Sequence, residues 1–310
     1  MRVSLVATVK DAGDRIDAFL ASLATQTRAP DEVVIVDGGS TDGTLGRLRA
    51  AAGVRAIEAP GANIARGRNL AVAAASNDVL AVTDADCVLE PTWLERILVP
   101  IADGADVAMG AYVPIAETTF TRAVAATNLP DPEDLDAARF LPSARSLAVR
   151  REALAAVGGW PEWLDVGEDM WVDLRWRGRG ADLRLARDAI VRWPLRTSVA
   201  ATWTQYRRYA RGDALGRMHP RRHALRFAVY AGALALVAIG TPPAWVALAA
   251  GAAARAAAPA ARALRRGGPD RVAVALLAVP VLGLLDLAKM TGYLGGLVAR
   301  ARRDPRPSER

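Results

Sequence analysis

Short apolar runs alternate with amphipathic stretches along the first two-thirds of this chain. Apolar runs bounded by polar or glycine-containing turns are typical of buried strands. After the first run, Ile16, Phe19, Leu20 and Leu23 recur at helical spacing and predict a helix that buries one face. The predicted strands are residues 3–9, 33–36, 54–57, 79–82, 107–113, 146–149 and 189–193, and further predicted helices are residues 45–52, 69–75, 94–101, 151–157 and 168–177. This alternation predicts a Rossmann-like α/β fold, with a mostly parallel sheet and helices on both faces.

The last third of the chain has a different pattern. Residues 228–254 and 272–285 contain no charged side chain, which predicts membrane-associated helices. Pro242 and Pro243 predict the turn of a helical hairpin, and a single kinked helix is the alternative. Helices of a soluble core are a further alternative, because alanine-rich runs are only weakly apolar. The arginines that flank these runs are Arg207, Arg208, Arg211, Arg217, Arg221, Arg222, Arg226, Arg262, Arg265, Arg266, Arg271, Arg300, Arg302, Arg303, Arg306 and Arg310.

These patterns divide the 310 residues into four parts. We expect a catalytic domain at residues 1–205, a basic juxtamembrane segment at 206–226, membrane helices at 227–298 and a basic tail at 299–310. Because positive clusters adjoin the apolar runs, the positive-inside rule predicts a multi-pass protein of the cytoplasmic membrane whose catalytic domain is cytoplasmic. The net charge of +7 does not indicate a nucleic-acid partner, since few aromatic residues lie among the arginines.

Two carboxylates follow one of the predicted buried strands. Asp84 and Asp86 come after residues 79–82, so they lie where open α/β sheets bind their ligands. Carboxylates at such an edge can hold Mg²⁺ or Mn²⁺, whose remaining positions accept diphosphate oxygens. For an isolated Asp-x-Asp, a solvated turn is the alternative, because aspartate is common in turns.

Two other acidic motifs stand where predicted helices begin. Asp37 ends the second strand and opens a glycine-rich loop, residues 38–44, whose polar side chains offer acceptors to a base or ribose. The alternative is a connecting loop in which a polar side chain caps the next helix. Glu168 and Asp169 open a later helix, where the alternative is an acidic first turn stabilised by the helix dipole.

Four motifs occur in the order of one known family. They are Val36-Asp37-Gly38-Gly39-Ser40-Thr41-Asp42-Gly43-Thr44, Gly61-Ala62-Asn63-Ile64-Ala65-Arg66-Gly67-Arg68-Asn69, Asp84-Ala85-Asp86, and Glu168-Asp169 after Gly158-Gly159-Trp160. Together they resemble the family 2 glycosyltransferases of the GT-A fold, in the membrane-anchored bacterial form. The resemblance extends from residue 3 to about residue 210 and is far more specific than any one motif.

The resemblance implies roles on the nucleotide side. Asp37 would contact the nucleotide base or ribose, Arg68 would help to place the nucleotide, and Asp84 would lie against the ribose or diphosphate. Asp86 would bind the divalent metal ion, Mn²⁺ or Mg²⁺. Such an ion neutralises the charge of a departing diphosphate.

The resemblance also implies roles on the reacting side. Asp169 would be the catalytic base, Glu168 would help to shape the sugar pocket, and Trp160 would lie on the acceptor or diphosphate side. Sugar transfer requires a carboxylate that takes a proton from the acceptor hydroxyl. A single base opposite the leaving group inverts the anomeric carbon.

A later basic segment resembles the Gln-x-x-Arg-Trp motif of processive members of the superfamily. It reads Gln205-Tyr206-Arg207-Arg208-Tyr209. The resemblance places Gln205, Arg208 and Tyr209 near the acceptor or diphosphate, and a basic amphipathic helix at a membrane surface is the alternative. Because Tyr209 stands in the tryptophan position, a processive polysaccharide synthase is not indicated.

Three positions depart from the family pattern. Asp11 stands where many members have asparagine, and Ala12 where they have glutamate; Thr8 and Asp11 are retained as donor-side candidates. Trp193 stands where many members have a histidine that is sometimes assigned to the metal. That metal ligand cannot be transferred to this chain.

The resemblance and the membrane pattern together predict the activity. We expect an inverting, metal-dependent glycosyltransferase that moves a sugar from a nucleotide-sugar to a lipid or lipid-linked acceptor, such as a polyprenyl phosphate, glycolipid or carotenoid. One alternative is a nucleotidyltransferase, which would share the nucleotide site but would not need Glu168 and Asp169. Another is a catalytically silent membrane scaffold, against which the intact Asp86 and Asp169 argue.

Overall fold

The structure of the protein, a computed structural model, describes residues 1–302 and contains two compact units. The sheet unit comprises Met1–Ile115 and Asp131–Pro194. The helical unit comprises Ala116–Pro130 and the chain from Leu195 onward. Most of the predicted basic tail, residues 303–310, lies outside the described residues.

The sheet unit is built on one mixed sheet. Within residues 1–302 its strands are β1 (Val3–Val9), β2 (Glu32–Asp37), β3 (Val54–Glu58), β4 (Val79–Val82), β5 (Val88–Leu89), β6 (Val107–Ile115), β7 (Leu147–Arg150) and β8 (Leu183–Pro194). Their order is β3-β2-β1-β4-β7-β6-β8-β5. The half formed by β1 to β4 is parallel, as predicted, but β7 runs antiparallel to both of its neighbours and β5 antiparallel to β8. The longest pairing, between β6 and β8, is parallel, so the sheet is mixed but mostly parallel, as predicted.

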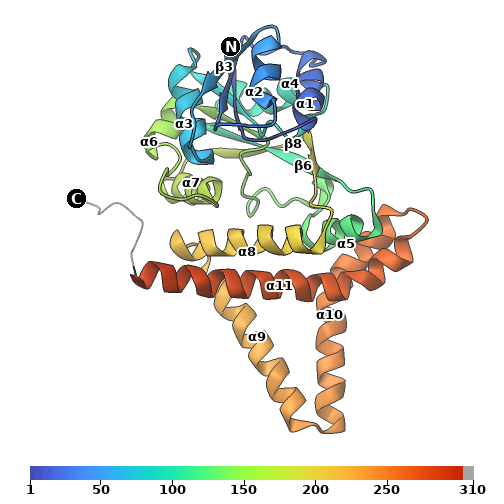
Figure 1. Cartoon of the computed structure of the whole chain (residues 1–310). Coiled ribbons are helices and arrows are strands. Elements are labelled where there is room, and N and C mark those ends of the chain that lie inside the picture. The colour runs from blue at the N-terminus through green and yellow to red at the C-terminus, as the bar shows by residue number, and fades with distance from the viewer. Residues whose placement is uncertain (303–310) are drawn as a thin grey trace. The chain divides into compact units, whose positions relative to one another are not determined.

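Helices pack on both faces of this sheet, as expected (Figure 1). They are α1 (Arg15–Ala24), α2 (Thr44–Ala50), α3 (Ile64–Ala74), α4 (Trp93–Ala102), α6 (Arg151–Ala156) and α7 (Glu168–Gly178), with a short 3₁₀ turn at Pro132–Asp134. Met109 of β6 packs into a core with Ala65 of α3 and Trp176 of α7. The next residue, Gly110, faces the opposite side, where a side chain would meet Ile97 of α4.

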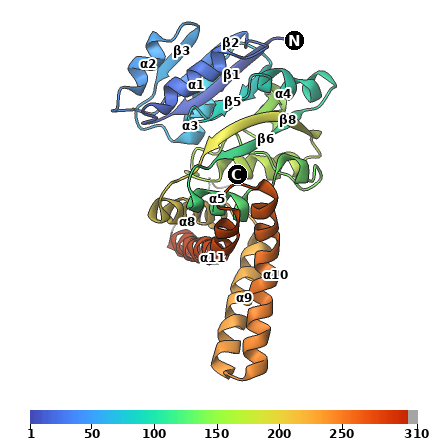
Figure 2. The same cartoon turned by 90° about the vertical axis from the view of Figure 1, so that its right-hand side faces the viewer.

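The helical unit contains α5 (Thr119–Asn128), α8 (Val199–Leu215), α9 (Pro220–Ile239), α10 (Pro242–Arg266) and α11 (Arg271–Arg302). The catalytic domain predicted from the sequence spans residues 1–205 and includes α5. The compact sheet unit ends at Pro194 and does not include α5. Three helices, α9, α10 and α11, are long and apolar enough to cross a membrane. Helices α9 and α10 form the predicted hairpin rather than one kinked helix (Figure 2). Gly240 ends α9 in a left-handed conformation.

Helices α8 and α11 lie side by side in very close contact (Figures 1 and 2). A Cβ atom on Gly292 would lie 2.0 Å from the backbone oxygen of Arg207, and one on Gly296 would lie 2.6 Å from Cβ of Ala214. The ring of Tyr293, between these glycines, stacks on His223 at 4.0 Å between centroids. Glycine at both positions lets the two backbones approach.

Replacing Gly292 by alanine should therefore destabilise the helical unit. The added methyl group meets rigid backbone, and overpacking of this kind costs about 1–3 kcal/mol. Gly295→Ala on the same helix is the matched control, because nothing lies within 4 Å of its added Cβ and alanine favours a helix. We expect thermal unfolding in detergent to shift down for Gly292→Ala and not for Gly295→Ala. Equal midpoints for the two variants would contradict the close packing.

Candidate active site

Polar side chains gather where three neighbouring strands end. Asp11 follows β1, Asp37 ends β2, and Asp84 and Asp86 follow β4. Strands β1, β2 and β4 are parallel neighbours in the sheet. Their carboxyl ends therefore lie at one edge, where open α/β sheets bind ligands.

Asp37 is fully buried and only half satisfied. Its Oδ1 accepts hydrogen bonds from the backbone N–H groups of Gly39, at 2.8 Å, and Ser40, at 2.7 Å. Its Oδ2 is buried without a hydrogen-bond partner among the described residues. A buried carboxylate oxygen without a donor is costly, so this atom is suited to accept a hydrogen bond from a ligand.

Asp11 and Thr8 hold the neighbouring backbone in place. Asp11 has a positive φ of 49°, and its Oδ1 accepts a hydrogen bond from the backbone N–H of Thr41 at 2.8 Å. Its own N–H donates to Oγ of Ser40 at 2.8 Å. The Thr8 hydroxyl donates to the backbone oxygen of Val36 at 3.2 Å, so it is engaged within the sheet.

The centre of the site is a buried arginine that joins two carboxylates. Arg68 of α3 is 3% exposed; its guanidinium donates to Oδ1 of Asp84 at 2.7 Å and to Oε1 of Glu168 at 2.5 Å. Arg145 lies 3.4 Å from the other oxygen of Asp84. The contacts connect α3, the end of β4 and the first turn of α7, which the sequence separates widely.

The surroundings shift the pKa values of Asp84 and Glu168 in opposite directions. Burial opposes the charge of Asp84, but Arg68 and Arg145 hold its pKa below the ordinary value. Burial and the adjacent Asp169 raise the pKa of Glu168 to about 7, although Arg68 favours its charged form. The site therefore has one firmly ionised carboxylate and one that titrates near neutrality.

Asp169 is the accessible carboxylate of this pair. It is half-buried in the first turn of α7. Its Oδ2 accepts a hydrogen bond from the Ser143 hydroxyl at 3.3 Å, and its Oδ1 accepts one from the N–H of Met170 at 2.8 Å. Trp160 is buried in the sheet-unit core, with its ring 5.8 Å from the Arg68 guanidinium.

Asp86 lies beside a cation at the open edge. Its side chain is 29% exposed, and Oδ2 lies 3.3 Å from a guanidinium nitrogen of Arg15. No group of three or more histidine, cysteine or acidic side chains within residues 1–302 is arranged to hold a metal. A single carboxylate still fits Mg²⁺ or Mn²⁺, because these ions commonly bind one or two carboxylates together with substrate phosphates.

Arg145 is a site residue that the sequence did not reveal. Its guanidinium stacks over Trp193 at 4.2 Å from the ring centroid and lies 5.3 Å from that of Tyr112, while it also contacts Asp84. The residue lies in a loop without a distinctive motif. The sequence hinted at Arg145 only indirectly, through Trp193. This tryptophan stands in the position of the family histidine, and the Arg145 guanidinium stacks on its ring.

Gln205, Arg208 and Tyr209 are not among the residues that the sheet unit brings together. They belong to α8 of the helical unit. Gln205 donates to the Tyr209 hydroxyl at 2.8 Å, the Tyr206 and Tyr209 rings meet edge to face, and Arg208 is exposed. Their expected role toward the acceptor stays a prediction.

Residues 4–148 match the family model of glycosyl transferase family 2. The match identifies residues 4–148 as a glycosyltransferase domain. No curated protein sequence matches it.

Solved structures of glycosyltransferases share its fold at low sequence identity. A mannosyltransferase, PcManGT from Pyrobaculum calidifontis, in complex with GDP-Man and Mn²⁺, is 19% identical, with 98% of this chain and 87% of that chain covered and a TM-score of 0.56. S. aureus TarS 1–349 is 16% identical, with coverage of 97% and 92% and a TM-score of 0.52. The same S. aureus protein with UDP is 17% identical, with coverage of 97% and 92% and a TM-score of 0.51. These likenesses confirm the predicted GT-A fold.

The raised pKa of Glu168 predicts how the stability of the glycosyltransferase depends on pH. In the unfolded chain Glu168 has its ordinary pKa of 4.5, whereas in the folded state its pKa is about 7. Between these values the folded state binds the extra proton, so the free energy of unfolding falls as the pH rises from about 4.5 to about 7. Glu168→Gln should remove this part of the pH dependence.

Thermal unfolding in detergent from about pH 5 to about pH 8 measures the effect. Glu152→Gln, a change at an exposed glutamate of α6, should retain the wild-type slope. An unchanged slope in Glu168→Gln would show that Glu168 ionises normally.

Proposed function

We propose that the enzyme transfers a sugar, with inversion, from a nucleoside-diphosphate sugar to a lipid or lipid-linked acceptor at the cytoplasmic face of a membrane. The observation that carries the proposal is the convergence at one sheet edge of the unsatisfied Asp37, the Arg68 network and the accessible Asp169. Asp37 offers a hydrogen-bond acceptor to the nucleotide, Arg68 provides a fixed positive charge, and Asp169 offers a base.

The donor would bind along the ends of β1, β2 and β4. The unpartnered oxygen of Asp37 would accept a hydrogen bond from the base or a ribose hydroxyl. Arg68 keeps Asp84 in position, and Arg145 supplies positive charge beside it. The mannosyltransferase of similar fold binds GDP-Man, and the S. aureus protein binds UDP, which supports a nucleotide-sugar here.

Asp86 would hold a divalent metal ion together with diphosphate oxygens. When bound, Mn²⁺ or Mg²⁺ neutralises charge on the departing diphosphate. Mn²⁺ in the mannosyltransferase structure supports this assignment. Arg15 stands 3.3 Å from Asp86 and would orient its carboxylate.

Asp169 would take the proton of the acceptor hydroxyl. The acceptor oxygen then forms a bond to the anomeric carbon as the bond from that carbon to the diphosphate oxygen breaks. Ser143 orients the carboxylate through its hydroxyl. One base opposite the leaving group gives inversion.

The helical unit would bind the membrane and carry residues that approach the acceptor. Three apolar helices support membrane association, and flanking arginines favour a cytoplasmic catalytic domain, with residues 1–205 as the catalytic part. Gln205, Arg208 and Tyr209 on α8 would approach the acceptor or diphosphate. A screen of nucleotide-sugars with polyprenyl phosphate and glycolipid acceptors, with and without Mn²⁺, tests the activity itself.

Asp169→Asn should reduce turnover by roughly 10²–10⁴-fold while donor binding persists, because the amide keeps the size but cannot take the proton. The exposed Asp188→Asn in the same unit is the matched control and should retain activity. Turnover is measured with the acceptor that the screen identifies. Near-normal turnover in Asp169→Asn would place the base elsewhere.

Asp86→Ala should abolish the dependence of nucleoside-diphosphate binding on Mn²⁺. Calorimetric titration of UDP and GDP with and without the metal measures this effect. Asp78→Ala, at the opposite end of β4 and exposed, should bind as the wild type does. Metal-enhanced binding that survives in Asp86→Ala would remove Asp86 from the metal site.

A further inference from the structure

Helices α9 and α10 form an apolar hairpin that lacks a covering partner within the described chain. In the most apolar windows of α9 and α10, only 6% and 17% of the residues are buried. Large apolar side chains are exposed along both arms, including Leu234, Ile239 and Val246. Helices that are apolar all round require an apolar environment, and the charge-free composition here suits lipid.

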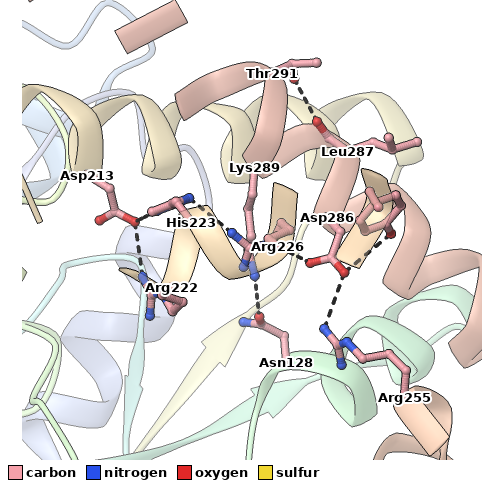
Figure 3. A network of polar contacts seen from close by, with 11 residues as sticks. Asn128, Asp213, Arg222, His223, Arg226, Arg255, Asp286, Leu287, Lys289 and Thr291 are labelled. Atoms are coloured by element: carbon pink, nitrogen blue, oxygen red, sulfur yellow. Dashed lines mark hydrogen bonds and ion pairs between the residues drawn. The ribbon is translucent and has the colours of Figure 1, made fainter. Parts of the chain in front are cut away.

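The carboxylate of Asp286 binds the arginine at the base of each arm of this hairpin. Asp286 of α11 accepts hydrogen bonds from Arg226 of α9 at 2.8 Å and from Arg255 of α10 at 3.4 Å (Figure 3). Tyr230, one turn further along α9, also donates to Asp286, at 3.5 Å. The two arginines therefore lie at the same height at the base of the hairpin, and no charged residue lies between them in the sequence.

The hairpin beyond this level is too short to cross a bilayer. Each arm from the arginine to the Gly240–Thr241 turn has about 13 residues, which at 1.5 Å per residue reach about 20 Å. The hydrocarbon core is about 30 Å thick. Charged groups at the Asp286 level stay near the headgroups, since their cost in hydrocarbon is high.

Helix α11 carries an apolar stripe along almost its whole length. The exposed members are Val272, Leu276, Val279, Leu287, Leu294 and Val298. Their spacing places them on one helix face, opposite the face with Val281, Gly292 and Gly296 that is buried. The buried face packs on α5 and α8, and α8 has exposed arginines at 207, 208 and 211. If α11 crossed the hydrocarbon, these arginines would be carried into it.

Cations outnumber carboxylates around the base of the hairpin. Figure 3 shows Arg222 and His223 on Asp213, and Arg226 and Arg255 on Asp286. Lys289 adds a further cation, whose Nζ donates to the amide oxygen of Asn128 at 3.3 Å. Basic pockets between such helices suit lipid phosphates.

We propose that the helical unit attaches to a single leaflet of an anionic membrane. The α9–α10 hairpin enters the hydrocarbon without crossing it, and α11 lies along the interface with its apolar stripe toward the acyl chains. Arg222, Arg226, Arg255 and Lys289 lie at the depth of the lipid phosphates. This arrangement is monotopic and differs from the multi-pass topology expected from hydropathy. It does not depend on which sugar or acceptor the enzyme uses.

Thiol labelling tests the hairpin directly in sealed membrane vesicles. Cys87 is the native cysteine and is buried, so cysteines introduced at other positions are the reactive ones. Arg2→Cys, at a side chain 77% exposed, reports the side of the sheet unit, and Thr241→Cys reports the hairpin tip. We expect an impermeant maleimide to label Arg2→Cys from one side and Thr241→Cys from neither until detergent is added. Labelling of Thr241→Cys from the side opposite to Arg2→Cys would overturn the proposal.

Depth measurements test α11 independently. Spin labels are attached to cysteines that replace Leu276, Leu287 and Leu294. The depth of each label in the bilayer is measured from its collision rates with oxygen and with a polar relaxation agent. A helix that lies flat predicts equal, shallow depths at the three positions. A depth that is greatest at the middle position would show that α11 crosses the membrane.

Anionic lipid dependence tests the cationic base of the hairpin. Flotation compares vesicles of phosphatidylcholine with vesicles that also contain phosphatidylglycerol. Arg255→Gln, at a side chain 55% exposed, should weaken binding to the anionic vesicles about fivefold. Arg139→Gln, at a side chain 89% exposed in the sheet unit, should not. Equal loss in both variants, or equal binding to neutral vesicles, would contradict phosphate contact at this level.

Discussion

The buried guanidinium of Arg68 is the interaction on which the sheet unit depends. It lies between Asp84 at the end of β4 and Glu168 in the first turn of α7. Without it, two acidic groups would stand close together away from water, which is strongly unfavourable. A single cation therefore fixes the end of a strand, the start of a helix and the charge of the site at once. Its backbone position, in turn, depends on Gly67, because a Cβ there would lie 2.2 Å from the Thr8 hydroxyl.

In the helical unit a buried carboxylate, rather than a buried guanidinium, joins charged groups from different helices. Asp286 of α11 forms ion pairs with Arg226 of α9 and Arg255 of α10. Around it, the close α8–α11 contact depends on glycine, and the apolar surfaces face outward rather than into a core. Exposed apolar surfaces of this size mark sites of interaction, and our proposal assigns this one to lipid. In that proposal the polar base and the apolar hairpin together attach the protein to the membrane.

Much of the sheet unit could be predicted from the sequence because buried strands and acidic strand ends have local patterns. The apolar runs before Asp37 and Asp84 predicted both the strands and the sheet edge at which these acidic side chains gather. The antiparallel direction of β7 could not be read, since an apolar run carries no sign of its direction. Arg145 was missed because its partners, Asp84 and Trp193, are distant in sequence. Hydropathy identified α11 as apolar, but only packing distinguishes its buried face from its exposed stripe.

The most direct test is a double-mutant cycle between Arg68 and Glu168, read by denaturant unfolding and by GDP and UDP binding. Arg68→Met alone should lower the free energy of unfolding by about 3–5 kcal/mol, because it leaves buried carboxyl groups without their cation. Adding Glu168→Gln should recover part of that loss, which gives a coupling well above the scatter of independent sites. Nucleotide binding should be lost in Arg68→Met, since the edge it organises is no longer fixed. Additive effects on stability, or unchanged nucleotide binding in Arg68→Met, would contradict the central role of this guanidinium.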